Sequence, residues 1–594
     1  MTWTRFAFLT ALCLLPGGSA PAGGPTASAP DPLIGLWATR LDLGTQVRGD
    51  LRIVSTRGAF EATIAGINVR FEPRGDSIQF ALPGPRGRFR GAWVRGHEAI
   101  EGFWVQPGSE LGDAGQSYAS PLTLRSDSPH SWHGTVVPLE DRFTLHLSIT
   151  QGPDDSLIAA FRNPERNSIG GATRFRIARD ADSLRFYTRA DTTHPQVRLT
   201  GAMVGDPPRL RVRWPDLGRV VELARPDPAL AAAFRPRPPG SAAYRYQAPA
   251  RTGDGWPTAR ATEVGMSEDS LARLVGRLID VDPNASRPAL IHALLIARKG
   301  KLVLEEYFFG FGRDLVHDTR SAAKTFASVM LGAAMRRGAA IAPETPVYPL
   351  FASLGPFDHP DPRKPRITLA QLMTHTSGLA CDENDDSSPG NEDLMQSQHR
   401  QPDWRRYTLD LPMAHDPGTT YAYCSAGMNL VGAALAASTG RWIPELFDQA
   451  IARPLGFGVY YWNLTPTLDG YTGGGVRMLP RDLLKLGQAY LDGGVWEGRR
   501  IVDSSWVRRS TTAQFQTGPQ TADGYAWHLN TFESGEHRYQ EYEANGNGGQ
   551  FLIVVPELEL AVVIFAGNYG QYGIWRHFRD DFVARDIVAA IREP

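Results

Sequence analysis

An uninterrupted helical pattern at residues 321–338 constrains the fold more than any other feature of this sequence. The segment is rich in Ala, contains no Pro and carries two arginines just before Gly338. Alanine favours a helix, arginines suit the last turn of one, and glycine commonly ends it. The pattern therefore predicts an apolar helix of about four turns, with Ser321 at its start.

Ser321 and Lys324 are three residues apart, so their side chains share one face of this helix. A serine hydroxyl becomes a nucleophile when a neighbouring base takes its proton, and a lysine can be that base if its pKa is lowered. A helix N-terminus also offers free backbone N–H groups to a developing oxyanion. The same spacing arises by chance in long chains, so the hypothesis depends on further motifs.

The composition is that of a globular protein with room for at least two cores: 594 residues, 42% hydrophobic and 21% charged. A net charge of −1 argues against nucleic acid or an anionic membrane surface as a partner. The histidines are scattered, so we expect neither a metal centre nor another cofactor. We expect a small-molecule or peptide substrate, and the oligomeric state stays open.

Residues 1–22 have the pattern of a secretory signal peptide, with a basic Arg5, an apolar run at 6–15 and small residues at 20–22. The apolar run is too short for a permanent membrane anchor, and no later run reaches about 18 apolar residues. We therefore expect export, to the periplasm or the cell exterior, without a transmembrane segment. An exported chain would keep two cysteines, in a compartment that permits disulfides.

Residues 31–226 read as short alternating runs separated by Gly, Pro, Asp and Asn. This pattern predicts an all-β region, either an antiparallel barrel or a sandwich. Weak internal similarity suggests two repeats, at 31–126 and 131–226. No catalytic constellation is visible here, so a spacer or binding role is expected.

A Pro- and Ala-rich stretch at 227–255 predicts a semi-rigid, partly extended linker. From residue 256 to 594 the pattern changes to helices interleaved with strands, which predicts a separate α/β domain. Its first elements are a helix and a strand pair that turns at Lys299–Gly300, at residues 267–280, 289–298 and 301–309.

Three more motifs follow the Ser321 helix. One is the block His375-Thr-Ser-Gly-Leu379, and the second runs from Asp416-Pro-Gly through Tyr423 into an apolar helix. The third is the glycine-rich segment 544–550, which precedes two strands. In this order, the motifs resemble the serine hydrolases of the penicillin-binding-protein and class C β-lactamase superfamily, particularly its esterase and aminohexanoate-dimer hydrolase branches. The resemblance covers about residues 255–590.

The resemblance implies a β-lactamase/transpeptidase-like α/β fold for this half of the chain. It also implies that Ser321 is the acyl-accepting nucleophile, with Lys324 and Tyr423 as its general base and acid. A phenol beside a protonated lysine can have its pKa lowered, which suits Tyr423 to relay the proton. The backbone N–H groups of Ser321 and Asn547 would form the oxyanion hole.

Two positions depart from the family pattern. Ser425 stands where relatives often carry Asn, and Ala544-Asn545-Gly546 stands where they carry Lys-Thr-Gly or His-Thr-Gly. Ser425, Asn545 and Gly546 are candidate substrate-binding residues. Because residue 544 has no basic side chain to pair with a substrate carboxylate, acyl transfer is expected and β-lactam specificity is not.

The resemblance also places Cys381 and Cys424 beside the active site, which predicts a disulfide between them; two buried cysteines that never meet are the alternative. His375 is expected to be a structural hydrogen-bonding residue. The acidic loop 382–386 lacks the spacing of a calcium site and is expected to be a solvated face.

The sequence therefore predicts an exported serine hydrolase that cleaves an ester or amide through an acyl-enzyme on Ser321. A D-alanyl-D-alanine peptidase or a weak β-lactamase is the alternative enzyme. A protein that keeps the fold without catalysis, and serves as a binding or sensor protein, is the alternative of another class.

Overall fold

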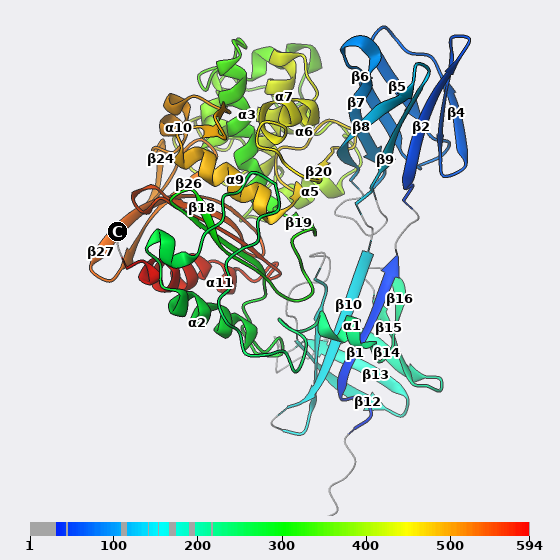
Figure 1. Cartoon of the computed structure of the whole chain (residues 1–594), viewed down its shortest axis with the longest axis vertical. Helices are drawn as coiled ribbons and strands as arrows, with labels where there is room; N and C mark the ends of the chain where they lie inside the picture. The colour runs from blue at the N-terminus through cyan, green and yellow to red at the C-terminus, as the bar shows by residue number, and fades with distance from the viewer. Residues whose placement is uncertain are drawn as a thin grey trace, which may run out of the picture.

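A computed structural model describes residues 31–592, apart from 43–45, 109–115, 140–141, 153, 165–173, 189–196 and 215–217. The chain forms an all-β N-terminal region followed by a mixed α/β domain (Figure 1). This is the predicted fold class. The predicted signal peptide lies outside the described residues. None of the described helices combines the length and apolar composition needed to cross a membrane.

One N-terminal sheet is antiparallel, and its ends meet in a barrel-like closure. Ala38 and Ala224 exchange backbone hydrogen bonds of 2.8 and 3.0 Å, joining the first strand to the residue after the last. Apolar side chains such as Trp37, Phe143 and Phe186 fill the interior. In sheet order the strands are β1 (Gly35–Asp42), β10 (Arg142–Gln151), β11 (Leu157–Arg162), β12 (Arg174–Asp180), β13 (Ser183–Thr188), β14 (Val197–Val204), β15 (Arg209–Trp214) and β16 (Arg219–Leu223).

The remaining N-terminal strands form a second antiparallel unit with its own core, which includes Ile53, Phe89 and Trp132. Its strands are β2 (Gly49–Thr56), β3 (Ala59–Ile64), β4 (Ile67–Phe71), β5 (Ser77–Ala81), β6 (Arg88–Trp93), β7 (Ala99–Gln106), β8 (Tyr118–Ser128) and β9 (Ser131–Val136).

The two β units are not consecutive in sequence. Strand β1 pairs with β10 over eight register positions, and β9 pairs with β2. The suggested repeats 31–126 and 131–226 therefore do not coincide with the two sheets, because β1, the first strand of the chain, belongs to the sheet formed by β10–β16. Weak internal sequence similarity cannot reveal that β1 pairs with β10, since strand pairing is a long-range contact.

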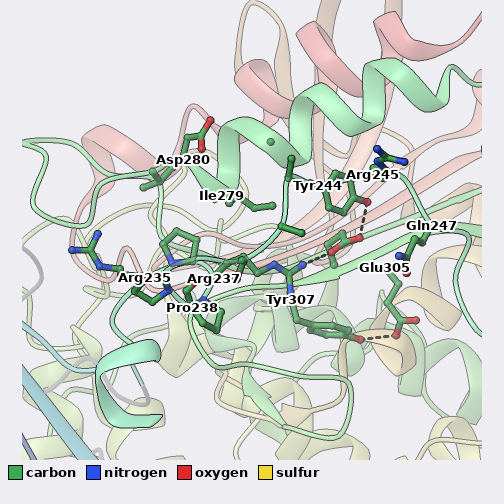
Figure 2. A pocket seen from close by; sticks show the side chains of 18 of the residues that line it. Arg235, Arg237, Pro238, Tyr244, Arg245, Gln247, Ile279, Asp280, Glu305 and Tyr307 are labelled. Carbon is green, nitrogen blue, oxygen red and sulfur yellow. Dashed lines mark hydrogen bonds and ion pairs between the residues drawn. The ribbon is translucent and has the colours of Figure 1, made fainter. Parts of the chain in front are cut away.

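The stretch after β16 begins with the short helix α1 (Pro228–Ala232) and continues as extended chain. The extended part lies along β18, where the Tyr246 hydroxyl donates to the Val303 carbonyl at 2.7 Å. The Tyr244 hydroxyl and the Arg237 guanidinium both donate to the Glu306 carboxylate. Figure 2 labels these two donors. These contacts hold the predicted linker against the α/β domain.

The α/β domain is built on an eight-stranded antiparallel sheet that is covered on both faces (Figure 1). Alternate residues of β17 enter different cores: Leu295 packs on the side of α3, α7 and α9, and Leu294 on the side of α2. In sheet order the strands are β18 (Lys301–Tyr307), β17 (Ile291–Arg298), β29 (Leu560–Ala566), β28 (Gln550–Val555), β27 (His537–Gly546), β26 (His528–Ser534), β25 (Thr521–Asp523) and β24 (Phe515–Gly518).

The predicted first elements are confirmed as α2, β17 and β18, with Lys299 and Gly300 at positive φ in the turn. The long helices are α2 (Glu268–Ile279), α3 (Lys324–Arg336), α7 (Ser425–Thr439) and α9 (Pro480–Leu491). The shorter elements are α4 (Leu369–Met373), α5 (Glu392–Ser397), α6 (Trp404–Asp410), α8 (Ile443–Phe447), α10 (Ser504–Ser510), α11 (Tyr572–Trp575), β19 (His317–Asp318), β20 (Tyr460–Asn463), β21 (Arg477–Met478), β22 (Val495–Trp496) and β23 (Arg499–Arg500).

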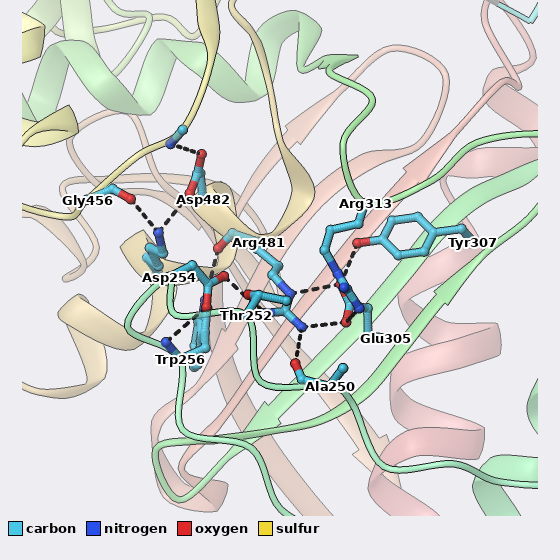
Figure 3. Close-up of polar contacts among 12 residues, drawn as sticks. Ala250, Thr252, Asp254, Trp256, Glu305, Tyr307, Arg313, Gly456, Arg481 and Asp482 are labelled. Carbon is cyan, nitrogen blue, oxygen red and sulfur yellow. Dashed lines mark hydrogen bonds and ion pairs between the residues drawn. The ribbon is translucent and has the colours of Figure 1, made fainter.

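A buried polar network joins the end of the linker to α9 and β18 (Figure 3). Arg481 donates to both carboxylate oxygens of Glu305 at 2.8 and 2.6 Å, and their side chains are 4% and 2% exposed. The same guanidinium binds Asp254, Thr252 and the Ala250 carbonyl. One arginine thus ties the linker to two elements of the α/β domain.

The N-terminal region is joined to the α/β domain by strand pairing and shared packing. Strand β8 pairs with β20, in the register Ala119 to Trp462 and Tyr118 to Asn463. Three residues of the N-terminal region lie in the main α/β core: Phe103, Val105 and Ala119.

Candidate active site

The Ser321 turn begins the helix that the sequence predicts. Residues Arg320–Ala323 form one 3-10 turn, and α3 continues from Lys324. Lys324 Nζ donates to Ser321 Oγ at 2.9 Å and to the Gly473 carbonyl at 2.5 Å. The i, i+3 spacing therefore brings the two side chains into direct hydrogen-bond contact.

Lys324 does not have the lowered pKa that a free lysine base would need. Its side chain is buried, which lowers the pKa, but the Tyr423 phenol and the carboxylates of Glu392 and Glu383 outweigh that effect and raise the pKa above its usual value. Lys324 is therefore a protonated ammonium at neutral pH. It is suited to donate hydrogen bonds and stabilise negative charge, and the proton acceptor must be another group.

Tyr423 lies beside this ammonium, two residues before α7 begins. Lys324 Nζ is 4.9 Å from the centre of the Tyr423 ring. The ring packs 4.5 Å from that of His375, whose Nδ1 accepts a hydrogen bond from the Cys424 N–H. Burial lowers the pKa of His375 to about 3, so this imidazole is neutral and acts as a hydrogen-bond acceptor.

Glycines let two backbone segments approach the Ser321 N–H. A Cβ on Gly546, the last residue of β27, would lie 2.5 Å from the Thr319 carbonyl and 3.0 Å from the Ser321 nitrogen. Gly474 has φ +152°, and a Cβ there would lie 3.1 Å from the Arg320 carbonyl. Both positions require glycine if β27 and the 473–475 loop are to border the Ser321 turn.

Ser321 and Tyr423 open onto a cavity of about 920 Å³, which also includes Asn547. Such a volume holds a ligand much longer than a short acyl group. The cavity has an acidic side that the sequence did not reveal, formed by residues of the loop before α5 and of α5 itself: Glu383, Asp386, Glu392 and Asp393.

Glu383 corrects the expectation that the acidic loop 382–386 is simply a solvated face. Asn384, Asp385 and Asp386 are exposed, but Glu383 turns inward and accepts hydrogen bonds from the Glu392 and Ser425 N–H groups, each at 2.8 Å. Burial first and the neighbouring Glu392 second raise the pKa of Glu383 to about 7.

This raised pKa predicts a specific pH dependence of stability. Folding favours the protonated carboxyl, so stability is fully present below about pH 4.5 and is lost as the pH rises through about 7. The Glu383→Gln side chain cannot ionise, so this loss should be absent in the variant. Between about pH 4.5 and 7, the wild type should lose on the order of 2 to 3 kcal/mol more free energy of unfolding than the variant. Urea unfolding at several pH values measures it. Parallel pH profiles for the two proteins would contradict the assignment.

The predicted substrate-binding residues Ser425 and Asn545 are engaged with carboxylates. Ser425 is fully buried, and its hydroxyl donates to Glu392 at 3.2 Å. Asn545 lies beside Ser321 and Lys324, and its amide nitrogen donates to Glu543 at 2.9 Å. Direct contact of either with a substrate stays a prediction.

A second feature that the sequence did not predict is the pair of His528 on β26 and Asp523 on β25. They border the small space that Lys324 and Ala544 also line. Burial lowers the pKa of His528, but the Asp523 carboxylate, 2.8 Å from Nδ1, raises it by more, so the net shift is upward. A titratable imidazole on the strand next to β27 thus lies near position 544, where it is paired with the Asp523 carboxylate.

A disulfide joins Cys381 to Cys424, as predicted. It connects the loop after the His375 block to the N-cap of α7, where Cys424 Sγ also accepts the Gly427 N–H. The bond therefore lies next to Tyr423 in the chain and restrains both loops at the cavity.

We expect loss of this bond to reduce stability by about 2 to 4 kcal/mol, because it closes a loop with a sequence separation of 43. The double variant Cys381→Ala/Cys424→Ala and the reduced wild type should lose similar amounts in urea unfolding. Thiol counting on denatured protein lacking residues 1–22 is the check. Two free thiols without reductant would show that the bond does not form.

Comparison with known proteins places this site in a family. Residues 291–573 match the family described as Beta-lactamase, so this part of the chain is a Beta-lactamase family domain. The 6-aminohexanoate-dimer hydrolase of Paenarthrobacter ureafaciens is 27% identical over 260 residues, covering 40% of this chain and 61% of the relative. The D-alanyl-D-alanine-carboxypeptidase/endopeptidase AmpH of Escherichia coli K12 is 25% identical over 226 residues, covering 33% and 57%.

The chain thus spans about three fifths of the length of these curated relatives. Among solved structures, EstCE1, described as a hydrolase with promiscuous acyltransferase activity, aligns with a TM-score of 0.43 and 16% identity. That alignment covers 55% of this chain and 99% of EstCE1.

Proposed function

We propose that this protein, through its Beta-lactamase family domain, is an exported serine hydrolase that cleaves an ester or amide through an acyl-enzyme on Ser321. The observation that carries the proposal is the contact of Ser321 Oγ with a buried, protonated Lys324, beside Tyr423 and at the wall of a large cavity. The disulfide is compatible with export.

In the proposed acylation step, Tyr423 reacts as its phenolate and takes the proton of Ser321 as Oγ attacks the substrate carbonyl. The Lys324 ammonium stabilises negative charge on the Tyr423 oxygen, since a cation favours a nearby anion most where water is excluded. The N–H groups of Ser321 and Asn547 would bind the oxyanion. Tyr423 then returns the proton to the leaving oxygen or nitrogen as the carbonyl bond to it breaks.

Deacylation repeats these roles with water as the nucleophile. Tyr423 takes a proton from water, the oxyanion forms again, and Ser321 leaves with the proton that Tyr423 returns. The sum of both steps is hydrolysis, with neither a metal nor another cofactor in the scheme.

For the substrate, we propose a linear ester or uncharged amide rather than a β-lactam. Ala544 offers no charge to a substrate carboxylate, and the cavity lining carries four acidic side chains against two arginines, Arg320 and Arg576. Such a surface disfavours anionic substrates and favours neutral or cationic ones. The relatives named for an aminohexanoate dimer and for D-alanyl peptides make amides the first compounds to test.

A substrate screen of the purified protein tests the proposal. It comprises p-nitrophenyl esters, the linear dimer of 6-aminohexanoate, D-alanyl-D-alanine peptides and a chromogenic cephalosporin, each also tried with Ser321→Ala. We expect kcat/KM for the best ester or amide to exceed that for the cephalosporin by about 100-fold or more. Efficient cephalosporin hydrolysis would overturn the substrate assignment. No turnover and no labelling by a fluorophosphonate would favour a non-catalytic binding protein.

A further inference from the structure

The N-terminal β region contributes to the wall of the candidate active site. Gln116, two residues before β8, and Tyr118, its first residue, line the same 920 Å³ cavity as Ser321. On the α/β side the neighbouring lining residues are Asn463, at the end of β20, and Gly475. The cavity is therefore formed by both parts of the chain.

This wall is firmly attached to the α/β domain. Beyond the pairing of β8 with β20, the Leu464 N–H donates to the Ser117 carbonyl at 2.9 Å. Farther along the interface, Phe103 packs edge-on against Trp442 at 5.5 Å. Two residues that lie more than three hundred positions from β20 in sequence are thus held at the cavity that Ser321 also lines.

Three buried amide atoms of this wall, on Gln116 and Asn463, lack hydrogen-bond partners within the described residues. Gln116 is 5% exposed, and neither its amide nitrogen nor its amide oxygen has a hydrogen bond in the part of the chain that the structure describes. Asn463 is 5% exposed, and its Oδ1 also has none. Buried amide groups are almost always paired in folded proteins, because leaving one unpaired is costly. Unpaired amides at the wall of a cavity indicate that a ligand completes them.

The complementary ligand is another amide. A glutamine side chain offers donors on nitrogen and acceptor positions on oxygen, and a secondary amide offers one N–H and one carbonyl in return. An ester or hydrocarbon chain lacks the donor that the Gln116 and Asn463 oxygens need.

We propose that Gln116 and Asn463 form a subsite that binds a secondary amide of the substrate, separate from the bond that Ser321 cleaves. The preferred substrates are then oligoamides or peptide-like esters, recognised in part by the N-terminal β region. This inference rests on the proposed hydrolase function and defines the substrate more narrowly.

Two matched substrate pairs test the subsite, one for each side of the cleaved ester. The p-nitrophenyl ester of N-acetyl-β-alanine is compared with p-nitrophenyl hexanoate, which has the same chain length. On the leaving-group side, 4-acetamidophenyl acetate is compared with 4-propylphenyl acetate. The quantity measured is the ratio of kcat/KM for the amide compound to that for its apolar partner.

In Gln116→Leu, which removes both amide atoms at similar size, this ratio should fall about 10-fold or more in at least one pair. Gln116→Glu removes the donors but keeps the shape, and its ratio must also fall, which retains a test if the leucine variant does not fold. The matched control is Gln79→Leu, an exposed glutamine of β5 whose amide donates to Ser77, and its ratios should match the wild type.

Unchanged ratios in both pairs for the Gln116 variants would overturn the subsite and indicate that water alone satisfies these amides. That result differs from failure of the hydrolase proposal, in which the wild type would hydrolyse none of the four esters or Ser321→Ala would remain active. Binding gives a second readout: Ser321→Ala should bind the N-acetyl-β-alanine ester or the 4-acetamidophenyl ester about 10-fold more tightly than Ser321→Ala/Gln116→Leu.

Discussion

Replacing Ser321 by alanine is expected to abolish turnover, and Lys324→Ala and Tyr423→Phe should each lower kcat by about 100-fold or more. Ser321→Ala removes the atom that would be acylated. Lys324→Ala removes the ammonium that contacts Ser321 Oγ at 2.9 Å, and Tyr423→Phe removes the phenol that would carry the proton. Steady-state hydrolysis of a p-nitrophenyl ester measures all three effects.

Ser328→Ala is the matched control, because it makes the same substitution in the same helix. Ser328 is fully buried in α3 and does not line the cavity. Its kcat should stay close to that of the wild type. Turnover that survives in Ser321→Ala would refute the mechanism. Full activity in Tyr423→Phe, with Ser321→Ala inactive, would assign the proton transfer to another group.

Replacing Arg481 by methionine is expected to cost about 3 to 5 kcal/mol of folding free energy, because it leaves part of a buried ion pair uncompensated. Glu305 would lose two hydrogen bonds from Arg481 and keep those from Arg313 and Tyr307. The linker would lose the contacts of Asp254 and the Ala250 carbonyl with the same guanidinium. Urea unfolding followed by tryptophan fluorescence measures the loss.

An exposed arginine provides the comparison for this variant. Arg585 is 61% exposed and pairs with Asp581 one turn earlier, so Arg585→Met should change stability by about 0.5 kcal/mol or less. Equal losses in the two variants would show that the buried network adds nothing beyond a surface ion pair. A large loss in Arg481→Met alone would confirm that the buried network contributes more to stability than a surface ion pair does.

Local features of this site were predictable because they follow from short-range geometry. The spacing of Ser321 and Lys324 places them on one helix face, and the run to Gly338 determines where that helix ends. Likewise α2 and the hairpin at Lys299 follow from hydrophobic periodicity and turn residues. The placement of Tyr423 and the disulfide came from resemblance of motif order rather than from any local rule.

The protonation of Lys324 and Glu383 was decided by the tertiary structure. Residues in contact share no fixed spacing along the chain, so the carboxylates that raise the pKa of Lys324 could not be identified from its neighbours in sequence. Glu383 looked like part of a solvated loop, but its exposure depends on how that loop packs against α5 and α7. Burial raises the pKa of Glu383, whereas neighbouring groups raise the pKa of Lys324 against the effect of burial, and both causes depend on packing.

The pairing of strands also could not be predicted from the sequence pattern. Alternating residues predict strands and their buried faces, but they do not determine which strand lies beside which. The pairing of β1 with β10 and of β8 with β20 joins segments distant in sequence. The sequence by itself thus determined a helix that carries Ser321 and Lys324 and a separate β-rich region. Only the tertiary structure brought Gln116 and Tyr118 to the cavity, because long-range backbone hydrogen bonds and a shared core hold them there.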